Sequence, residues 1–383
     1  MMIAESLLAR NPIYEDFFQR EAPRLARTAR CMADRFRRGG RLLAFGAGAQ
    51  ATDAQHISVE FIHPVIVGKR ALPAIDLSNF LGSHVETLFR AEDIVVAFGT
   101  PQAEPAICAA LLCARRIGAM TCALPGNLGD YFVERFSPDA FLHQEMLEIL
   151  YHTLWESVHV YLEHDDLTAH AGESSFLYPF LDSARQLADP AGDVAQSIRM
   201  KVEEDAQLRR ETARQAAYIE QACEAIAAAL QKGGQLLIFG NGGSATDAND
   251  FAFDCVQPPP GLRSIPALSL AAEPAVLTAL ANDVGNDAVF LRQLIAHARP
   301  HDVVIAISTS GGSRNLIAAL EEARRRELTT VALLGYDGGE VCRRKLADYA
   351  IVVPSDYIPR IQEVQASIYH VMREALEEAL PHA

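Results

Sequence analysis

The chain has 383 residues, of which 50% are hydrophobic and 22% are charged, and its formal net charge is −15. The length allows two domains with separate cores. The negative charge argues against a general binder of nucleic acid or membranes, but permits a phosphate site of helix N-termini and hydroxyls. No apolar run reaches membrane-spanning length, the first residues show no signal-peptide pattern, and the seven cysteines form no C-x-x-C pair. We therefore expect a cytoplasmic protein with reduced cysteines.

The first half alternates short apolar runs with segments of helical periodicity. A helix is predicted from about Ala22 to Arg38, ending at Gly39-Gly40. Strands are predicted at 42–45, 72–77, 94–98 and 120–124, and further helices at 104–117 and 142–162. This alternation is typical of a parallel sheet with helices on both faces.

A connector rich in turn residues follows, and we predict domain boundaries of 1–165, 166–194 and 195–383. The connector contains one possible short helix at Phe180–Leu187. The second half then repeats the alternation, beginning with a long predicted helix over 196–231. Its strands are predicted after Leu236 and near 265–270, 303–308, 330–334 and 350–353, and its last helix at 359–380.

The two halves share residues in the same order. Phe45-Gly46 and the ATDA of 51–54 match Phe239-Gly240 and the ATDA of 245–248, an offset of 240 − 46 = 194 residues. Near the end of each half, Gln144-Glu145 with His152 matches Gln362-Glu363 with His370. These matches indicate an internal duplication.

Two loops of the second half have the composition of a phosphate site. The first, Gly240–Ser244, joins an apolar run to a predicted helix, and its glycines let the backbone approach an anion. The second, Ser308–Ser313, offers hydroxyls and backbone N–H groups just before another predicted helix. Either loop alone could be an ordinary helix cap, but the pair in this order predicts phosphate binding.

The second half resembles the SIS (sugar isomerase) family, and within it the phosphoheptose isomerase group. The matching stretches are GNGGSATDA at 240–248, LANDVGND at 280–287, ISTSGGSRN at 307–315, ALLGYDGGE at 332–340 and RIQEVQASIYH at 360–370. The resemblance implies a doubly wound, flavodoxin-like α/β fold with a five-stranded parallel sheet, so we expect two such domains in tandem, the first diverged. It also implies subunit assembly, here as a homodimer that forms a pseudo-tetramer of domains.

The resemblance implies the roles of individual residues. Phosphate ligands are expected at Asn241, Gly242, Ser244, Ser308, Thr309, Ser310 and Ser313, and other substrate contacts at Asn282, Asp283 and Gln362. Members of the group carry a His and a Glu four residues apart and a Gln and a His eight apart, which resembles a divalent-metal site, usually zinc. In the first half the matching residues are His56, Glu60, Gln144 and His152.

The halves have lost complementary features. In the second half the metal positions read Asp250, Asp254, Gln362 and His370. In the first half the hydroxyl loop is replaced by Gly99–Glu104, whose carboxylate would repel phosphate. We therefore predict one composite site, with phosphate held by the second half and the acid–base and metal residues supplied by the first. A decayed, purely structural first half is the alternative.

The expected reaction is aldose–ketose isomerisation of a sugar phosphate through an enediol, with sedoheptulose 7-phosphate as the first candidate. Glu60 is the expected base and His152 its acid–base partner. The arginine that the family carries after the catalytic Glu is absent, since Pro64 and Pro258 stand there, which leaves a shorter sugar open. The second half also resembles the SIS-fold protein that binds the initiator DnaA, so a non-catalytic interaction module is an alternative. A sugar-phosphate sensor is a third, although no helix-turn-helix region is evident.

Overall fold

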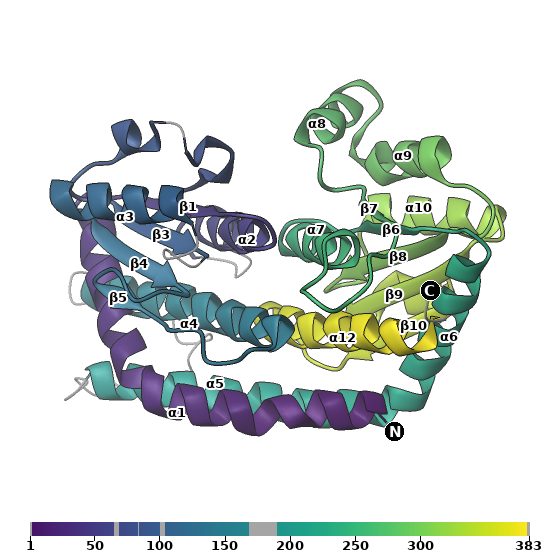
Figure 1. Ribbon diagram of the computed structural model, residues 1–383, viewed down its shortest axis with the longest axis horizontal. Helices are drawn as coiled ribbons and strands as arrows, with labels where there is room; N and C mark the ends of the chain where they lie inside the picture. The colour runs from purple at the N-terminus through teal and green to yellow at the C-terminus, as the bar shows by residue number, and fades with distance from the viewer. Residues whose placement is uncertain (1, 65–68, 83, 100–103, 168–189, 381–383) are drawn as a thin grey trace. The chain divides into compact units, whose positions relative to one another are not determined.

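The computed structural model describes residues 2–64, 69–82, 84–99, 104–167 and 190–380 (Figure 1). The chain forms two compact units, one of Ile13–Glu203 and one of Met1–Pro12 with Glu204–Ala383. Most of the predicted connector, including the possible helix at Phe180–Leu187, lies outside the described residues, while residues 166–167 and 190–194 are helical. The predicted domain boundaries stay a prediction.

The unit of Ile13–Glu203 is built on one parallel sheet. Its strands are β1 (Leu42–Gly46), β2 (Ala74–Asp76), β3 (Ile94–Phe98), β4 (Met120–Leu124) and β5 (Tyr131–Phe132), in the order β2-β1-β3-β4-β5. One face packs against α1 (Met2–Arg37), α2 (Gln50–Ile62) and α4 (Ala140–Leu167), and the other against α3 (Pro105–Ile117). Two short 3₁₀ helices, η1 (Ser78–Phe80) and η2 (Val85–Leu88), follow β2.

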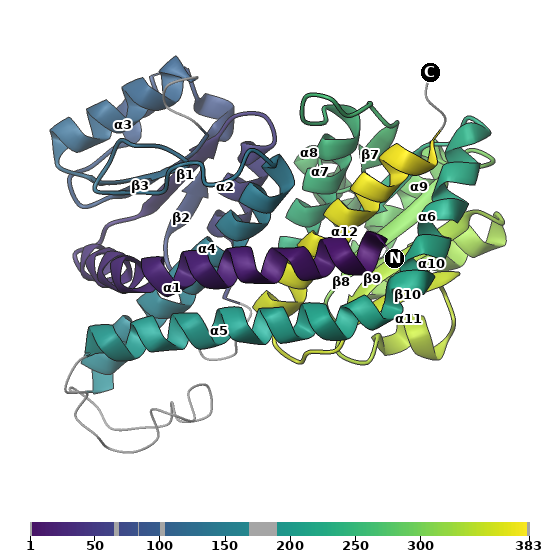
Figure 2. The ribbon, with the colours of Figure 1, turned by 60° about the horizontal axis from the view of Figure 1, so that its bottom comes forward.

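The other unit has a second parallel sheet of β6 (Leu236–Phe239), β7 (Ala267–Ser269), β8 (Val303–Ser308), β9 (Thr329–Gly335) and β10 (Tyr349–Val353). Its order, β7-β6-β8-β9-β10, repeats that of the first sheet. One face is covered by α6 (Ala216–Gln231), α7 (Gly243–Val256) and α12 (Ile358–Ala379), of which α6 and α12 lie side by side (Figure 2). The other face is covered by α9 (Val289–His297), α10 (Arg314–Arg325) and α11 (Gly339–Arg343). The remaining elements are α5 (Pro190–Thr212), η3 (Ala213–Gln215), α8 (Pro274–Asp283) and η4 (Asn286–Ala288).

The predicted fold class is confirmed, and two predicted helices are corrected. The helix expected from Ala22 begins at Met2, because Tyr14, Phe18, Ala22 and Leu25 continue one buried face through the earlier residues. The single helix expected over 196–231 is interrupted, since α5 ends at Thr212 and η3 precedes α6. The fifth strand of the first sheet has only two residues and was not predicted.

Two hydrogen-bond motifs recur in the sheets. Asp93 accepts from the N–H groups of Arg41 and Arg90, at 3.1 and 2.9 Å, as Asp302 accepts from those of Gln235 and Arg299, at 3.0 and 2.9 Å. A second motif, the Thr–Asp clasp, joins Thr121 to Asp130, nine residues on, and Thr330 to Asp348, eighteen residues on. In each clasp the threonine N–H and hydroxyl donate to one carboxylate oxygen, at 2.8–2.9 Å. These repeats agree with the duplication read from the sequence.

None of the helices that the structure describes combines the length and the apolar character needed to cross a membrane.

Candidate active site

The two predicted phosphate loops lie next to each other, at a switch point of the second sheet. Strands β6 and β8 are neighbours, and the chain leaves them in opposite directions, toward β7 and toward β9. Loops at the carboxyl ends of such strands form the crevice in which α/β proteins bind ligands. An amide pair joins the two loops: the Nδ2 atom of each of Asn241 and Asn315 donates to the Oδ1 atom of the other, at 3.0 and 2.8 Å.

The first loop requires glycine at its start. A Cβ atom at Gly240 would lie 2.2 Å from the carbonyl oxygen of Ser244 and 2.8 Å from that of Ile307, so any side chain would push the loop from β8. Gly242 then precedes α7, and Ser244 is buried in its first turn. The first N–H groups of a helix have no carbonyl partner within it, so they are available to an anion.

Hydrogen bonds within the second loop fix the conformation of its backbone. The N–H of Gly311 donates to the hydroxyl oxygen of Ser308 at 3.0 Å, and the N–H of Gly312 to that of Ser310 at 3.3 Å. Gly311 has φ +58°, and a Cβ atom there would lie 2.3 Å from the carbonyl oxygen of Gly338, before α11. Ser310 is exposed, Thr309 and Ser313 are half-buried, and α10 begins immediately after Ser313.

The other predicted substrate contacts lie in different environments. Asn282 and Asp283 are exposed at the end of α8, where the Asn282 Nδ2 atom donates to the Asp283 Oδ1 atom at 2.7 Å. Gln362 is buried on α12. Their roles stay predictions.

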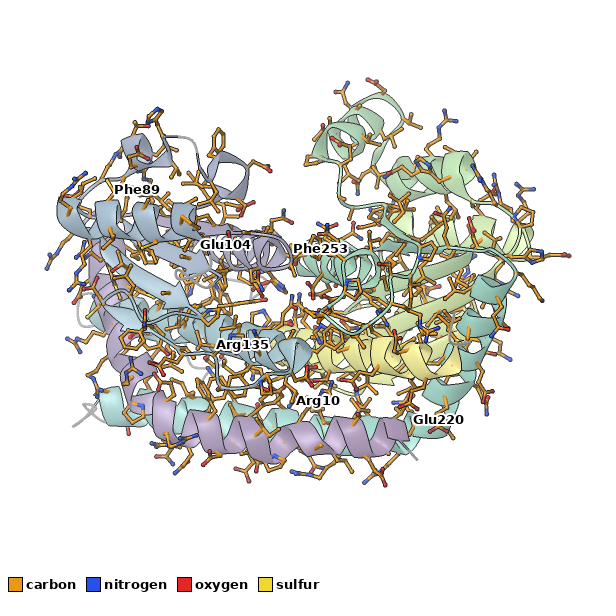
Figure 3. All side chains as sticks on the ribbon, in the orientation of Figure 1. Arg10, Phe89, Glu104, Arg135, Glu220 and Phe253 are labelled. Carbon is orange, nitrogen blue, oxygen red and sulfur yellow. The ribbon has the colours of Figure 1, made fainter. Side chains whose placement is uncertain are left out.

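The corresponding loops of the first sheet lack these features. Ala47 stands where the second half has Asn241, and Ala106 occupies the second position of α3, as Asn315 does in α10. Glu104 immediately precedes α3 (Figure 3), and the preceding residues 100–103 lie outside the described residues. The described part of this edge therefore offers no amide pair like that of the second half.

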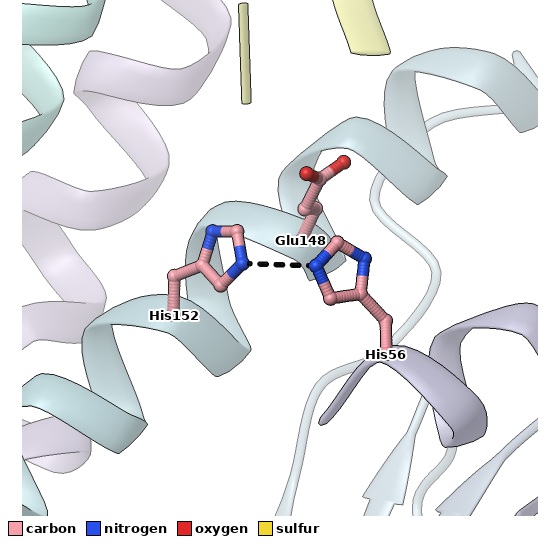
Figure 4. A group of neighbouring side chains, drawn as sticks. All are labelled: His56, Glu148 and His152. Atoms are coloured by element: carbon pink, nitrogen blue, oxygen red, sulfur yellow. Dashed lines mark hydrogen bonds between the residues drawn. The ribbon is translucent and has the colours of Figure 1, made fainter. Parts of the chain in front are cut away.

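The first half instead contains a buried group of His56, Glu148 and His152, which we call the His–Glu–His group (Figure 4). His56 lies on α2, and the other two residues lie one turn apart on α4. Their ligand atoms all lie within 4.8 Å of one another, and the two Nε2 atoms are 3.4 Å apart. Two ligands at about 2.0–2.1 Å from a tetrahedral zinc lie about 3.3 Å apart, so these imidazoles fit such an ion.

Glu60 lies beside this group without belonging to it. Its Oε1 atom is 3.8 Å from the His56 Nε2 atom, and its side chain is fully buried. Within the part of the chain that the structure describes, neither carboxylate oxygen has a hydrogen-bond partner. Burial, with the nearby charge of Glu156, raises the pKa of Glu60 to about 8. A carboxyl group with such a pKa can accept a proton near neutral pH.

Of the four residues predicted to bind a metal, the structure places His56 and His152 3.4 Å apart through their Nε2 atoms and Glu60 3.8 Å from His56. It also places Glu148, which was not among the predicted residues, beside the two histidines. Gln144 is half-buried, one turn before Glu148 on the same helix. The sequence did contain a signal, because Gln144, Glu148, His152 and Glu156 recur every four residues and so share one helix face. Glu156 forms an ion pair with Lys201.

The second half contains a different buried group, Asp250, Asp254 and His370, which we call the Asp–Asp–His group. The His370 Nε2 atom is 3.2 Å from the Asp254 Oδ2 atom and 3.7 Å from the Asp250 Oδ2 atom. The Tyr369 hydroxyl donates to Asp250 at 2.9 Å. Burial and the charge of Asp250 raise the pKa of Asp254 to about 6.

Comparison with known proteins agrees with the geometry of the second half. The SIS domain profile matches residues 203–335. The phosphoheptose isomerase of Pelobacter propionicus is 48% identical over 153 residues, which cover 40% of this chain and 80% of the relative. That of Thermodesulfovibrio yellowstonii is 40% identical over 193 residues, or 49% of this chain and 94% of the relative.

One solved structure shares the fold along nearly the whole chain. The C-terminal domain of glucosamine-fructose-6-phosphate aminotransferase from Francisella tularensis has a TM-score of 0.59 at 9% identity, covering 96% of each chain. At this identity the likeness concerns the fold alone.

Proposed function

This chain belongs to the SIS domain family, and on that premise we propose that it is an aldose–ketose isomerase acting on a sugar phosphate. Sedoheptulose 7-phosphate is the first substrate to test, because the relatives cited above are phosphoheptose isomerases. The observation that carries the proposal is the buried Glu60 carboxylate beside the imidazole of His56, since a module that only bound phosphosugars would not need an acid–base group there.

The phosphate is bound by the loops after β6 and β8. Hydroxyls of Ser244, Ser308, Thr309, Ser310 and Ser313, with the side chain of Asn241 and the backbone at Gly242, supply donors without a cation. Asn282, Asp283 and Gln362 contact the sugar. Anchoring the phosphate far from the reacting carbons orients C1 and C2 for proton transfer.

The chemistry is a proton transfer between C1 and C2 through an enediol. Glu60 removes the proton from one carbon, and its raised pKa places it near the pH at which a base is most effective. His152 exchanges a proton with the carbonyl oxygen. Burial of both side chains excludes water, which strengthens their electrostatic effect on the developing oxyanion.

A divalent metal, zinc by the resemblance, fits the imidazole pair. The sequence assigns it to His56, Glu60, Gln144 and His152, and the 3.4 Å separation of the two Nε2 atoms supports a site there. When bound, such an ion polarises a carbonyl oxygen.

The proposal also divides the work between the halves, and this step rests on the sequence. The second half keeps the phosphate loops, and the first keeps His56, Glu60 and His152. We infer one site made of both sets of residues, and a homodimer that forms a pseudo-tetramer of domains.

A product assay with a panel of ketose phosphates, run with and without a chelator, tests the function. Turnover of sedoheptulose 7-phosphate supports the proposed substrate, and turnover of a shorter sugar phosphate alone corrects it. If no member of the panel is converted, the interaction module that resembles the DnaA-binding protein becomes the better description.

A further inference from the structure

We propose that Glu148, in place of Gln144 and Glu60, completes the metal site of His56 and His152. The inference rests on the proposed function, because it assigns the metal of that site. Its consequence is that Glu60 stays outside the ligand set and remains available as a base.

The geometry favours Glu148 over Glu60 as a ligand. Glu148 belongs to the buried group whose ligand atoms lie within 4.8 Å of one another, and Glu60 does not. The contact of Glu60 with this group is to His56, at 3.8 Å between the Oε1 and Nε2 atoms. Figure 4 shows the Glu148 carboxylate above the two rings, which face each other through their Nε2 atoms.

Glu148 also lies closer than Gln144 to His152 along α4. Glu148 is one turn from His152, whereas Gln144 is two turns away, a rise of about 12 Å along the axis. Glu148 is buried and Gln144 is half-buried. A carboxylate also provides a negative oxygen ligand for zinc, whereas an amide is neutral.

For Glu60, this assignment separates the roles of metal ligand and base, which would otherwise compete. His152 remains a ligand through Nε2, so its proton exchange would use Nδ1. A carboxylate that donates a lone pair to a metal is a weaker base, because the cation stabilises its negative charge. With Glu148 as the anionic ligand, the ion has one carboxylate and two neutral imidazoles, and Glu60 keeps its own lone pairs for the substrate proton.

A carboxylate at the position of Glu148 occurs in the first half and not in the second. The residue of α12 that corresponds to Glu148 is Ala366, between Gln362 and His370. Residues aligned between the halves therefore gave no reason to select position 148. The carboxylates of the second group come from α7 instead.

The test is a zinc titration of the chelator-stripped full chain, without sugar, by competition with a chromogenic chelator. Glu148→Gln keeps the side-chain shape, and we expect it to weaken zinc binding on the order of a hundredfold. Gln144→Ala should change the affinity less than Glu148→Gln does, and Glu60→Gln, which loses an outer contact to His56, should weaken it by about tenfold. The matched control is Glu145→Gln, which alters a buried carboxylate of the same helix that accepts a hydrogen bond from the Tyr14 hydroxyl.

Cobalt(II) spectra provide a second readout, since Glu148→Gln should change the visible bands and Glu145→Gln should not. Asp254→Asn, titrated in parallel, identifies any signal from the Asp–Asp–His group. Unchanged affinity in Glu148→Gln, or loss of binding in a correctly folded Gln144→Ala or Glu60→Gln, overturns the assignment. A wild-type chain that binds no zinc also overturns it, while the sugar assay decides the proposed function separately.

Discussion

The His–Glu–His and Asp–Asp–His groups differ in where their charges lie. In each group, a histidine of α4 or α12 lies beside residues of the helix that follows the first strand of the sheet, which is α2 in the first half and α7 in the second. In the first half α2 supplies an imidazole, His56, and α4 supplies the carboxylate of Glu148. In the second half both carboxylates come from α7, and Ala366 replaces the glutamate.

The difference extends to hydrogen bonding. Asp254 contacts His370 through its carboxylate, and Asp250 accepts from Tyr369, so both acids of the second half have protein partners. The Glu60 carboxylate has no hydrogen-bond partner among the described residues. A buried polar group without a hydrogen bond destabilises the fold, so its presence points to a role with a ligand. This contrast is the reason for proposing that the first half carries the chemistry.

The largest expected effect is on turnover. Glu60→Gln and His152→Ala should each lower kcat by at least roughly 10²–10⁴-fold, because the first removes the proposed base and the second removes both its acid–base partner and a ligand of the proposed metal. Phosphosugar binding should persist in both variants, which isothermal titration can confirm. Asp254→Asn is the matched variant in the second half and should matter far less. If Asp254→Asn alone is inactive, the assignment of chemistry to the first half is wrong.

The next effect concerns the phosphate loops. Replacing Ser310 and Ser313 together by alanine should raise KM on the order of a hundredfold, since two hydrogen bonds to a charged group are lost. Because the phosphate is bound equally in ground and transition states, kcat should change little. Thr87→Ala is a control, an exposed hydroxyl of the first half that donates to the His84 carbonyl. An unchanged KM in the double variant would mean that the anchor lies elsewhere.

The pH dependence of stability separates the two groups. Since the pKa of Glu60 is raised to about 8, the folded chain retains a proton that the unfolded chain releases from about pH 4.5 upward. Glu60 therefore lowers stability as pH rises through this window, by up to about 1.4 kcal/mol per pH unit. The glutamine of Glu60→Gln cannot titrate. After treatment with a chelator, the free energy of unfolding of this variant should therefore rise relative to that of the wild type as pH increases, until about pH 8.

The pKa of Asp254 is raised to about 6. The difference in unfolding free energy between Asp254→Asn and the wild type should therefore stop growing near pH 6. Urea unfolding at several pH values measures both curves. If the unfolding free energies of Glu60→Gln and Asp254→Asn, each relative to the wild type, change with pH in the same way, Glu60 and Asp254 do not differ in pKa as stated.

The smallest effect concerns the amide pair between the loops. Asn315→Ala should cost about 1–2 kcal/mol of stability and raise KM severalfold, because Asn241 loses its partner and the loops are no longer joined. Asn249→Ala removes a hydrogen bond to Ser269 in the same half and serves as the control, with an unchanged KM. Stability and KM that both match the wild type in Asn315→Ala would show that the pair does not position the loops.

Much of the fold could be predicted because the long strands are continuous apolar runs buried on both faces, as in Leu42–Gly46 and Val303–Ser308. The two-residue β5 is too short to produce such a pattern. The predicted start of α1 was too late: the helix passes through Pro12, and Tyr14 and Phe18 extend its buried face toward the N-terminus.

The candidate site was predictable only in part. His56, Glu60 and His152 occupy positions of the metal-site pattern that the family resemblance implies, so the resemblance selected them. Glu148 has no counterpart to match, and its position became evident only when α2 and α4 were seen together. Sequence spacing places residues on one helix face, but which of them reach a neighbouring helix depends on the packing of the two helices.

The Thr–Asp clasps show how the two halves tolerate different lengths of chain. The clasp from Thr330 spans eighteen residues and that from Thr121 spans nine, yet each fixes the chain at the edge strand of its sheet. The longer span contains α11, where Val341 donates to the Gly311 carbonyl of the serine loop. The half without the hydroxyl loop has the shorter span. The extra residues therefore support the serine loop from the side of β10, and the two Thr–Asp clasps show that one anchoring contact can close connections of quite different length.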